Sequence, residues 1–366
     1  MSKVLVAGHI CLDMTPVFYN SSSNDFEPGK LTVVGPAETH SGGAVSNTGL
    51  AMAFFGTDVI LQSKIGNDAF GEVLSSIVSK NNVRSNLVID NDNPTSYSIV
   101  IARPNIDRSF LHCPGCNNTF TSDDITNDDL KDVSLMHFGY PTLMRQMYLN
   151  NGDELFKLFK KVHDQNILTS LDLTVVDPLS EAGKVDWDNI LKRTLLFVDF
   201  FVPSFEELLF MLNRPKYEEL VSLPGDICLN AKLKDIKFLA DKCISYGARV
   251  VLIKVGAAGM YYKVGKKEDF LSKINLKKEE WINKENFQKS YKPQKIVSAT
   301  GAGDTSIAAF LSAIMKGYSI EKCVSYAAAT GSLCCQTIDT LSGLKQFEEV
   351  DEMINNGWET QDFLKE

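Results

Sequence analysis

Short apolar runs alternate with stretches of helical periodicity along most of this chain, and that order constrains its fold more than any other feature. The apolar runs suit strands covered on both faces and lie at residues 3–7, 59–63, 134–138, 168–173, 197–202 and 250–255. Helical patterns lie at 44–55, 68–81, 143–163, 204–213 and 230–246, and again at 302–317 and at about 320–336. The alternation predicts an α/β protein, a three-layer α/β/α sandwich with a mostly parallel central sheet.

Two early segments, 14–40 and 84–113, break this alternation. Both are rich in β-forming residues separated by Pro, Asn and Asp turns, so they favour antiparallel strands outside the main sheet. We expect them to form a small β-sheet lid. The core would then comprise residues 1–13, 41–83 and 114–345.

Two later segments also stand apart from the alternating pattern. Residues 265–295 contain nine lysines and five acidic residues. Such a segment can contact a polyanion, but a solvated insertion is the simpler expectation. Residues 346–366 are expected to form a C-terminal tail.

Charge and hydrophobicity exclude several classes of protein. The chain has 366 residues, a net charge of −9, 44% hydrophobic residues and 23% charged residues. These values are ordinary for a globular protein and argue against nucleic-acid or anionic-membrane partners. No apolar run has the length of a membrane span, and residues 1–8 resemble a buried strand more than a signal peptide. A cytoplasmic location is expected.

Cys113 and Cys116 have the spacing of a redox motif. A thioredoxin-like pair would precede a helix, whereas the polar stretch after Cys116 does not have a helical pattern. A zinc site would need more ligands at short spacing, and His112 is the one candidate nearby. We therefore favour a turn built on Pro114 and Gly115 over redox or metal chemistry.

The glycine-rich stretch Val297-Ser-Ala-Thr-Gly-Ala-Gly-Asp304 leads directly into an apolar helical pattern. Such a turn presents bare backbone N–H groups at the positive end of the helix dipole, where anions bind. Gly301 and Gly303 would let the backbone approach a phosphate closely. Asp304 would lie beside that anion, where it could accept a proton during phosphoryl transfer. The alternative is that Asp304 only caps the helix.

A second group of small and polar residues lies near the N-terminus. Gly42 and Gly43 precede a helical pattern that contains Asn47, and Asp13 follows the first predicted strand. A carboxylate, an amide and exposed backbone groups suit a neutral polyhydroxylated ligand, because each hydroxyl both donates and accepts. Each residue also has a structural alternative, as a tight turn or a helix cap.

Together these motifs resemble the ribokinase-like carbohydrate kinase family, also called the phosphofructokinase B family. The residues that carry the resemblance are Gly8 to Asp13, Gly42-Gly43 with Asn47, Gly256 with Gly259, and Gly301-Ala302-Gly303-Asp304. Weaker similarities lie at 107–117 and 137–141. The resemblance spans about residues 2–345 in the expected order.

The resemblance implies ATP-dependent phosphorylation of a hydroxymethyl group on a sugar. Asp304 would be the general base, and Gly301, Ala302 and Gly303 would form the anion hole. Substrate hydroxyls would be held by Asp13, Gly42, Gly43 and Asn47. The nucleotide would lie along Lys254, Gly256, Gly259, Gly301 and Gly303.

The implied metal is Mg²⁺, which Glu207 would order through water. Ser204 replaces the Asn of the family's Asn-x-x-Glu motif, so the metal network is expected to differ. Ser298 replaces an Asp that helps to bind a monovalent cation, so K⁺ activation is doubtful. Lys254 replaces a frequent Thr and would reach a phosphate or be solvated. Of the family's Asp-x-Asn-x-Arg pattern, only Asp172 is kept.

Two alternatives to a sugar kinase are compatible with the resemblance. A nucleoside kinase of the adenosine type would share the base and the anion hole, and a non-catalytic regulator would only bind a sugar or nucleotide. The family also implies a homodimer through the β-lid. Side chains of the lid that could contact the substrate are His40, Tyr97, Arg108 and His112.

Overall fold

A computed structural model describes residues 3–19, 28–103 and 109–364. Within these ranges nine strands form the central sheet, in the order β13-β12-β11-β10-β9-β8-β1-β4-β5. The strands are β1 (Lys3–Gly8), β4 (Asp58–Gly66), β5 (Arg84–Asp90), β8 (Val133–Gly139), β9 (Leu168–Leu171), β10 (Phe200–Phe201), β11 (Val250–Lys254), β12 (Gly259–Val264) and β13 (Glu285–Lys289). Neighbouring strands from β5 to β11 are parallel, and β12 and β13 extend the sheet antiparallel.

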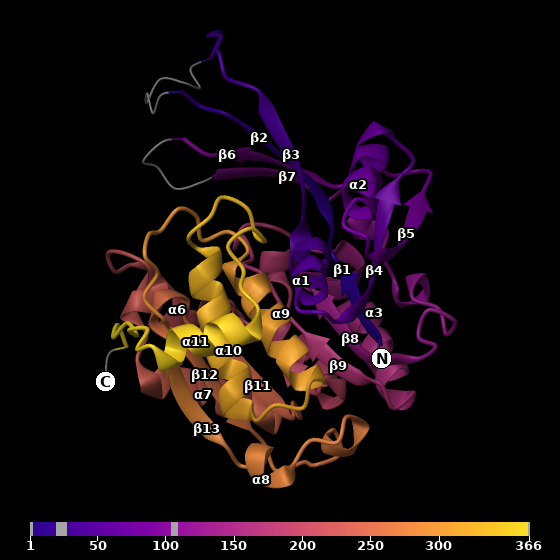
Figure 1. Ribbon diagram of the computed structural model, residues 1–366. Coiled ribbons are helices and arrows are strands. Elements are labelled where there is room, and N and C mark those ends of the chain that lie inside the picture. Colours follow the sequence, from indigo (N-terminus) through magenta and orange to yellow (C-terminus); the bar gives the residue numbers. More distant parts are fainter. Residues whose placement is uncertain (1–2, 20–27, 104–108, 365–366) are drawn as a thin grey trace.

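Helices cover both faces of this sheet (Figure 1). Side chains alternate along β1, so Val4 and Val6 join one apolar cluster while Leu5 and Ala7 join the other. The first cluster contains residues of α1 (Gly43–Phe54), α2 (Ala69–Ser79), α8 (Lys278–Trp281), α9 (Ala302–Met315), α10 (Ile320–Cys334) and α11 (Phe347–Asn355). The second contains residues of α3 (Arg145–Asp164), α4 (Trp187–Thr194), α5 (Phe205–Leu212), α6 (Arg214–Val221) and α7 (Leu233–Ser245). The predicted three-layer sandwich is thus confirmed.

The predicted helices correspond to α1, α2, α3, α5, α7, α9 and α10, with small differences at their ends. The short helices α4, α6, α8 and α11 were not predicted from the sequence. Nor was the interruption in α3 predicted, where Asn150, Asn151 and Gly152 have positive φ angles. None of the described helices is both long and apolar enough to cross a membrane.

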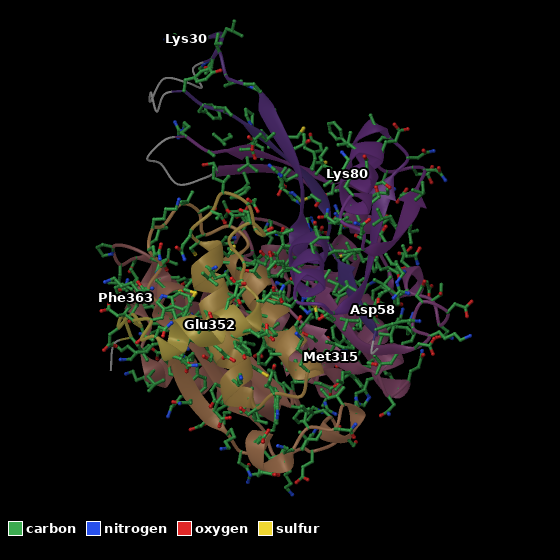
Figure 2. All side chains as sticks on the ribbon, viewed as in Figure 1. Lys30, Asp58, Lys80, Met315, Glu352 and Phe363 are labelled. Carbon is green, nitrogen blue, oxygen red and sulfur yellow. The ribbon has the colours of Figure 1, made fainter. Side chains whose placement is uncertain are left out.

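A separate four-stranded sheet projects from the core, and Lys30 lies at its outer tip (Figure 2). Its strands are, in order, β3 (Ala37–Gly42), β2 (Cys11–Pro16), β6 (Tyr97–Ile101) and β7 (Ser109–Cys113). We expected only antiparallel strands here, but β2 and β6 are parallel. The sheet begins at Cys11, three residues before the expected start of the lid.

The placement of 84–113 outside the main sheet is wrong for its first part. Residues 84–90 form β5, which pairs in parallel with β4 after the crossover through α2. This strand lies at the edge of the main sheet and is largely exposed, so its sequence lacks the continuous apolar run of a central strand. For this reason the composition of residues 84–90 resembles that of the segments that form the lid.

The segments expected to be an insertion and a tail both pack on the core. Phe270 and Trp281 of the 265–295 segment are fully buried, and β13 forms an edge of the main sheet. In the 346–366 segment, the ring of Phe347 stacks on Phe55 and on Tyr326, with ring centroids 4.7 and 4.3 Å apart. Neither segment is a solvated appendage, because its aromatic side chains complete the apolar layer.

Candidate active site

The glycine-rich turn opens α9, as predicted. Gly301 has φ +76°, and a Cβ at this position would lie 2.2 Å from Cγ2 of Thr340, so only glycine fits. No side chain caps the start of α9, and Gly301 and Gly303 line a cavity there. This geometry suits an anion. The N–H of Ala302, which the sequence placed in the anion hole, instead donates to the carbonyl oxygen of Ala299 at 3.2 Å.

Asp304 lies in the first turn of α9 and is buried. Its carboxylate accepts hydrogen bonds from side chains far away in the sequence. Nδ2 of Asn47 donates to Oδ2 at 2.9 Å, and the hydroxyl of Tyr140 lies 2.8 Å from both carboxylate oxygens. The capping alternative is therefore not what the structure shows for this side chain.

Burial raises the pKa of Asp304, while the hydrogen bonds from Asn47 and Tyr140 and the charge of Lys254 lower it in part. A carboxylate whose pKa moves toward neutrality is a better proton acceptor near neutral pH than an exposed one. The environment of Asp304 thus suits a general base.

The predicted substrate residues lie close to one another, and one of them, Asn47, contacts Asp304. A Cβ on Gly42 would lie 2.1 Å from the Asp13 carboxylate, and a Cβ on Gly43 would lie 2.6 Å from the carbonyl oxygen of His9. These glycines therefore allow the close approach of β2, β3 and α1. Asn47, in the second turn of α1, connects the group to Asp304.

Strand register adds two polar residues to Asp13. Asp13 of β2 pairs with Ser98 of β6, which pairs with His112 of β7, so the three side chains lie in one row on one face of the small sheet. Nδ1 of His112 lies 3.1 Å from Oγ of Ser98, and its Nε2 lies 3.3 Å from Nε2 of His9 in the core. His112 thus joins the small sheet to the core at the site.

His40 of β3 pairs with Asp13 and so lies in the same row, where it is exposed beside Glu38. Tyr97, on the neighbouring position of β6, packs against Phe70. Arg108 lies outside the described residues.

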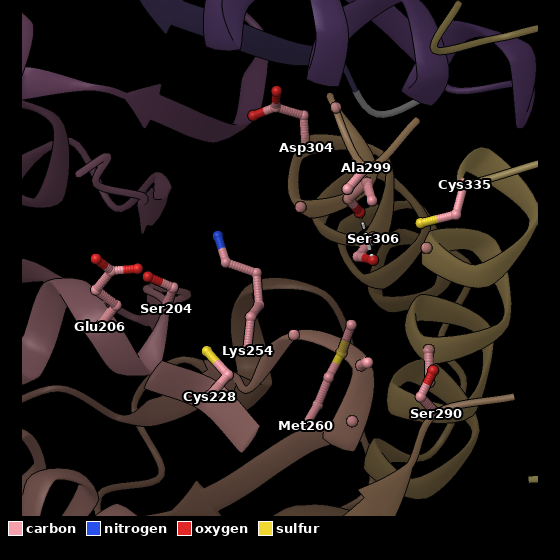
Figure 3. Close-up of a pocket in the computed structure, with 18 of the residues that line it drawn as sticks. Ser204, Glu206, Cys228, Lys254, Met260, Ser290, Ala299, Asp304, Ser306 and Cys335 are labelled. Atoms are coloured by element: carbon pink, nitrogen blue, oxygen red, sulfur yellow. Dashed lines mark hydrogen bonds between the residues drawn. The ribbon is translucent and has the colours of Figure 1, made fainter. Parts of the chain in front are cut away.

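A cavity of about 470 Å³ lies on the other side of Asp304. In Figure 3, Lys254 extends into this space below Asp304, with Ser204 and Glu206 along one wall and Ser306 along another. Gly256 and Gly259 also line it; they form the turn of the hairpin between β11 and β12. Gly256 and Gly259 thus belong to a hairpin turn and also line the cavity. The hairpin is therefore compatible with the predicted position of these glycines beside a nucleotide.

Lys254 is mostly buried and pairs with the buried Asp172, its Nζ 2.7 Å from Oδ1 of that residue. The alternative of a solvated lysine is wrong. Burial by itself would lower the pKa of Lys254, but the carboxylates of Asp172 and Glu207 raise it, so the ammonium stays protonated. Its Nζ would lie 3.8 Å from a Cβ placed on Gly303, at the anion-binding turn.

Comparison with known proteins agrees with this arrangement. A family model described as "pfkB family carbohydrate kinase" matches residues 1–346. The chain belongs to this family of carbohydrate kinases. An uncharacterized sugar kinase of Archaeoglobus fulgidus is 24% identical over 300 residues, which are 82% of this chain and 97% of that protein.

Solved structures share the fold. The ribokinase of Arabidopsis thaliana complexed with ribose and ATP has a TM-score of 0.70 and 19% identity, over 97% of this chain and 99% of that one. A candidate ribokinase II from E. coli, in complex with ATP and Mg²⁺, has a TM-score of 0.70 and 18% identity, over 97% and 100%. The predicted family resemblance is confirmed.

Within this pfkB family member, the Ser204 departure has a structural role. Oγ of Ser204 accepts from the backbone N–H of Glu207, and the Glu207 carboxylate accepts from the backbone N–H of Ser204 at 2.7 Å. This reciprocal capping box begins α5 and places Glu207 at the cavity wall. The described residues contain no cluster of three metal-ligating side chains. A carboxylate at the wall fits Mg²⁺ carried mainly by phosphates.

The cysteines of this kinase family member are all free thiols. Burial raises the pKa of Cys116 to about 12, so this side chain is a poor thiolate. Residues 115–119 form a 3₁₀ turn in which Gly115 has φ +50°, which agrees with the predicted turn at this pair.

Sequence reasoning missed two residues of the site. Tyr140 follows β8 and was noted only as part of a weak family similarity, and Asp172 follows β9 and was noted only as the remnant of a pattern. Both lie at the carboxyl ends of parallel strands, where ligands of open α/β folds bind, and that position was the available signal.

Proposed function

We propose that this protein is an ATP-dependent sugar kinase that transfers the γ-phosphate of ATP to a hydroxymethyl group of a sugar. One observation carries the proposal. The buried carboxylate of Asp304 lies beside the bare N-terminal turn of α9 and is hydrogen-bonded to Asn47 of the glycine-glycine segment. A proton acceptor, an anion cradle and a polar subsite are thus contiguous.

In the proposed reaction the substrate hydroxyl gives its proton to Asp304 while its oxygen bonds to the γ-phosphorus. The bond between that phosphorus and the bridging oxygen breaks, and ADP leaves. The N–H groups of Gly301 and Gly303 stabilise the charge on the transferred group, and they need no reorganisation because the helix fixes them, whereas that of Ala302 is bonded to Ala299. Asp13, Gly42, Gly43 and Asn47 orient the acceptor hydroxyl.

The nucleotide is proposed to lie in the 470 Å³ cavity, along Gly256 and Gly259, with Lys254 at the phosphates. When bound, Mg²⁺ would neutralise part of the phosphate charge, and Glu207 would hold it through water. Because Ser298 takes the place of the cation-binding Asp, we expect turnover without K⁺.

The test is Mg²⁺-ATP turnover against a panel of hexoses, pentoses, ketoses, sugar acids and nucleosides, with Asp304→Asn in parallel. Loss of the base should lower kcat by a factor of about 10² to 10⁴. Asp241→Asn is the matched control, since this exposed carboxylate pairs with Lys263 on the surface. We expect it to retain full activity.

Each result of the panel separates the alternatives. Turnover with sugars that depends on Asp304 supports the proposal, and a clear preference for nucleosides would replace it with a nucleoside kinase. Binding of ATP or sugar without any turnover would indicate a non-catalytic regulator.

A further inference from the structure

Tyr140 has no role in the motifs or in the mechanism above, although its hydroxyl lies 2.8 Å from both carboxylate oxygens of Asp304. A donor equidistant from the two oxygens lies on the plane that bisects them and favours neither oxygen. Asn47 donates to Oδ2 alone, at 2.9 Å, and this bond distinguishes the two oxygens. The carboxylate is therefore held by two donors that act together.

The backbone around Tyr140 determines where this hydroxyl points. Tyr140 has φ +63° and ψ +43°, a left-handed conformation that costs energy for a residue with a large side chain. Such a conformation persists where the surroundings impose it. Before it, Gly139 packs so closely that a Cβ there would lie 2.2 Å from Cβ of Ala44, and after it Pro141 is buried. The strain thus directs the phenol toward Asp304.

We propose that Tyr140 is a positioning residue: together with Asn47, its hydroxyl holds the Asp304 carboxylate in place and stabilises it in the ionised form. This inference rests on the proposed function. Tyr140 would act on the Asp304 carboxylate and would not contact the substrate.

The charge balance around Asp304 makes a hydrogen bond from Tyr140 consequential. Burial disfavours the charged carboxylate, and the bonds from Asn47 and Tyr140 together with Lys254 oppose that effect. The other titratable groups that face Asp304 or Tyr140 are Asp172, Glu207, Cys11, Cys334 and His9.

Most of these neighbours do not titrate near neutral pH. Burial raises the pKa of Cys11 well above its ordinary value, raises that of Cys334 to about 11 and lowers that of His9 to about 3. Asp172 is different, because burial raises its pKa to about 8. Asp172 can therefore contribute to the pH dependence of kcat. A direct titration of Asp304 is needed to assign the acid limb of that profile to Asp304.

The experiment compares Tyr140→Phe with Tyr148→Phe in the full chain. Tyr148 is a second buried tyrosine, and its hydroxyl contacts Glu181 at 3.4 Å, away from the site. Two readouts are collected: the pH dependence of kcat and kcat/KM for the acceptor found in the panel, and carboxyl-¹³C aspartate spectra. Asp304→Asn identifies the Asp304 signal.

In Tyr140→Phe the acid limb and the Asp304 signal should both move upward by about one pH unit, because the ionised form loses a hydrogen-bond donor. KM for the acceptor should stay within about twofold, since only an effect on the base is removed. Tyr148→Phe should match the wild type in both readouts.

An unchanged titration of Asp304 in Tyr140→Phe would overturn the inference, and so would a raised KM with an unmoved acid limb, which would indicate a substrate contact. Failure of the proposed function looks different, because no sugar would then be turned over, or turnover would not depend on Asp304. The aspartate spectra still report on Tyr140 in that case.

Discussion

At the residue scale, the ion pair of Lys254 and Asp172 combines stability with charge placement. Asp172 is almost fully buried, and removing a carboxylate from water is costly unless a cation faces it. Lys254 meets that need and at the same time brings an ammonium group to the cavity beside the anion-binding turn. The pair therefore links the folded state to the chemistry of the site.

Replacing Lys254 by Met should destabilise the protein by about 3–5 kcal/mol well above pH 8, because deprotonation of Asp172 then leaves a buried charge without its partner. The loss should shrink below about pH 8, where Asp172 binds its proton with or without the lysine. Burial raises the folded-state pKa of Asp172 to about 8, above the ordinary 3.8, so the stability of the wild type falls as the pH rises between these two values. Without the ammonium the pKa of Asp172 rises further, so the fall continues above about pH 8. Urea unfolding at several pH values measures it.

Lys263→Met provides the control for this prediction. Lys263 also bridges two carboxylates, Asp241 and Glu285, but all three side chains are partly exposed. Surface pairs contribute less than about 1 kcal/mol, so this variant should stay near the wild type at every pH. Equal losses in the two variants would contradict the role given to burial.

At the element scale, the start of α5 keeps a side-chain cap although Ser204 stands where the family motif has Asn. The capping box of Ser204 and Glu207 satisfies two N–H groups at the helix start and fixes the direction of the Glu207 side chain. Helix geometry, and not the identity of one side chain, thus brings the carboxylate to the cavity.

Ser204→Ala should lower the free energy of unfolding by about 1 kcal/mol, because the helix loses its side-chain cap. Ser204→Asn should cost less than about half of that, since Asn also caps helices well and restores the family's residue. Denaturant midpoints at an unchanged m-value measure the two changes. A larger loss with Asn than with Ala would show that capping is not the function of this residue.

At the scale of the whole molecule, the small sheet has an apolar row on the face opposite Asp13. Strand register places Met14, Ile99 and Leu111 side by side, and Leu111 is 57% exposed. The row stands on a sheet that projects from the core (Figure 1), so it is accessible to a second copy of the chain. An apolar sheet face of this kind favours association.

We predict a homodimer through this face, with a mass twice the 40.6 kDa of the chain in light scattering at micromolar concentration. Leu111→Lys should give the single-chain mass, because it places a charge in the apolar contact. Leu179→Lys should leave the dimer intact, since Leu179 is equally apolar and 81% exposed but lies in a loop of the core. A single-chain mass for the wild type would contradict the prediction.

Particular residues show how far sequence reasoning reached. At Gly301, Gly42 and Gly43 a Cβ would lie less than 3 Å from other atoms of the protein, so packing itself favours glycine there. The predicted approach of a ligand to these glycines stays a prediction. The layered architecture followed from the alternation of patterns. In contrast, β5 was assigned to the lid, because an exposed edge strand lacks the apolar run of a central one.

The sequence by itself determined what depends on neighbouring residues: periodicity, the conformational freedom of glycine, the start of α9 and the residue types at its first turn. Only the tertiary structure decided which groups surround Asp304. Asn47 and Tyr140 lie 257 and 164 residues away from it along the chain, and Asp172 and Lys254 are 82 residues apart. Buried polar groups must find partners, but the order of strands in the sheet determines which partners are within reach.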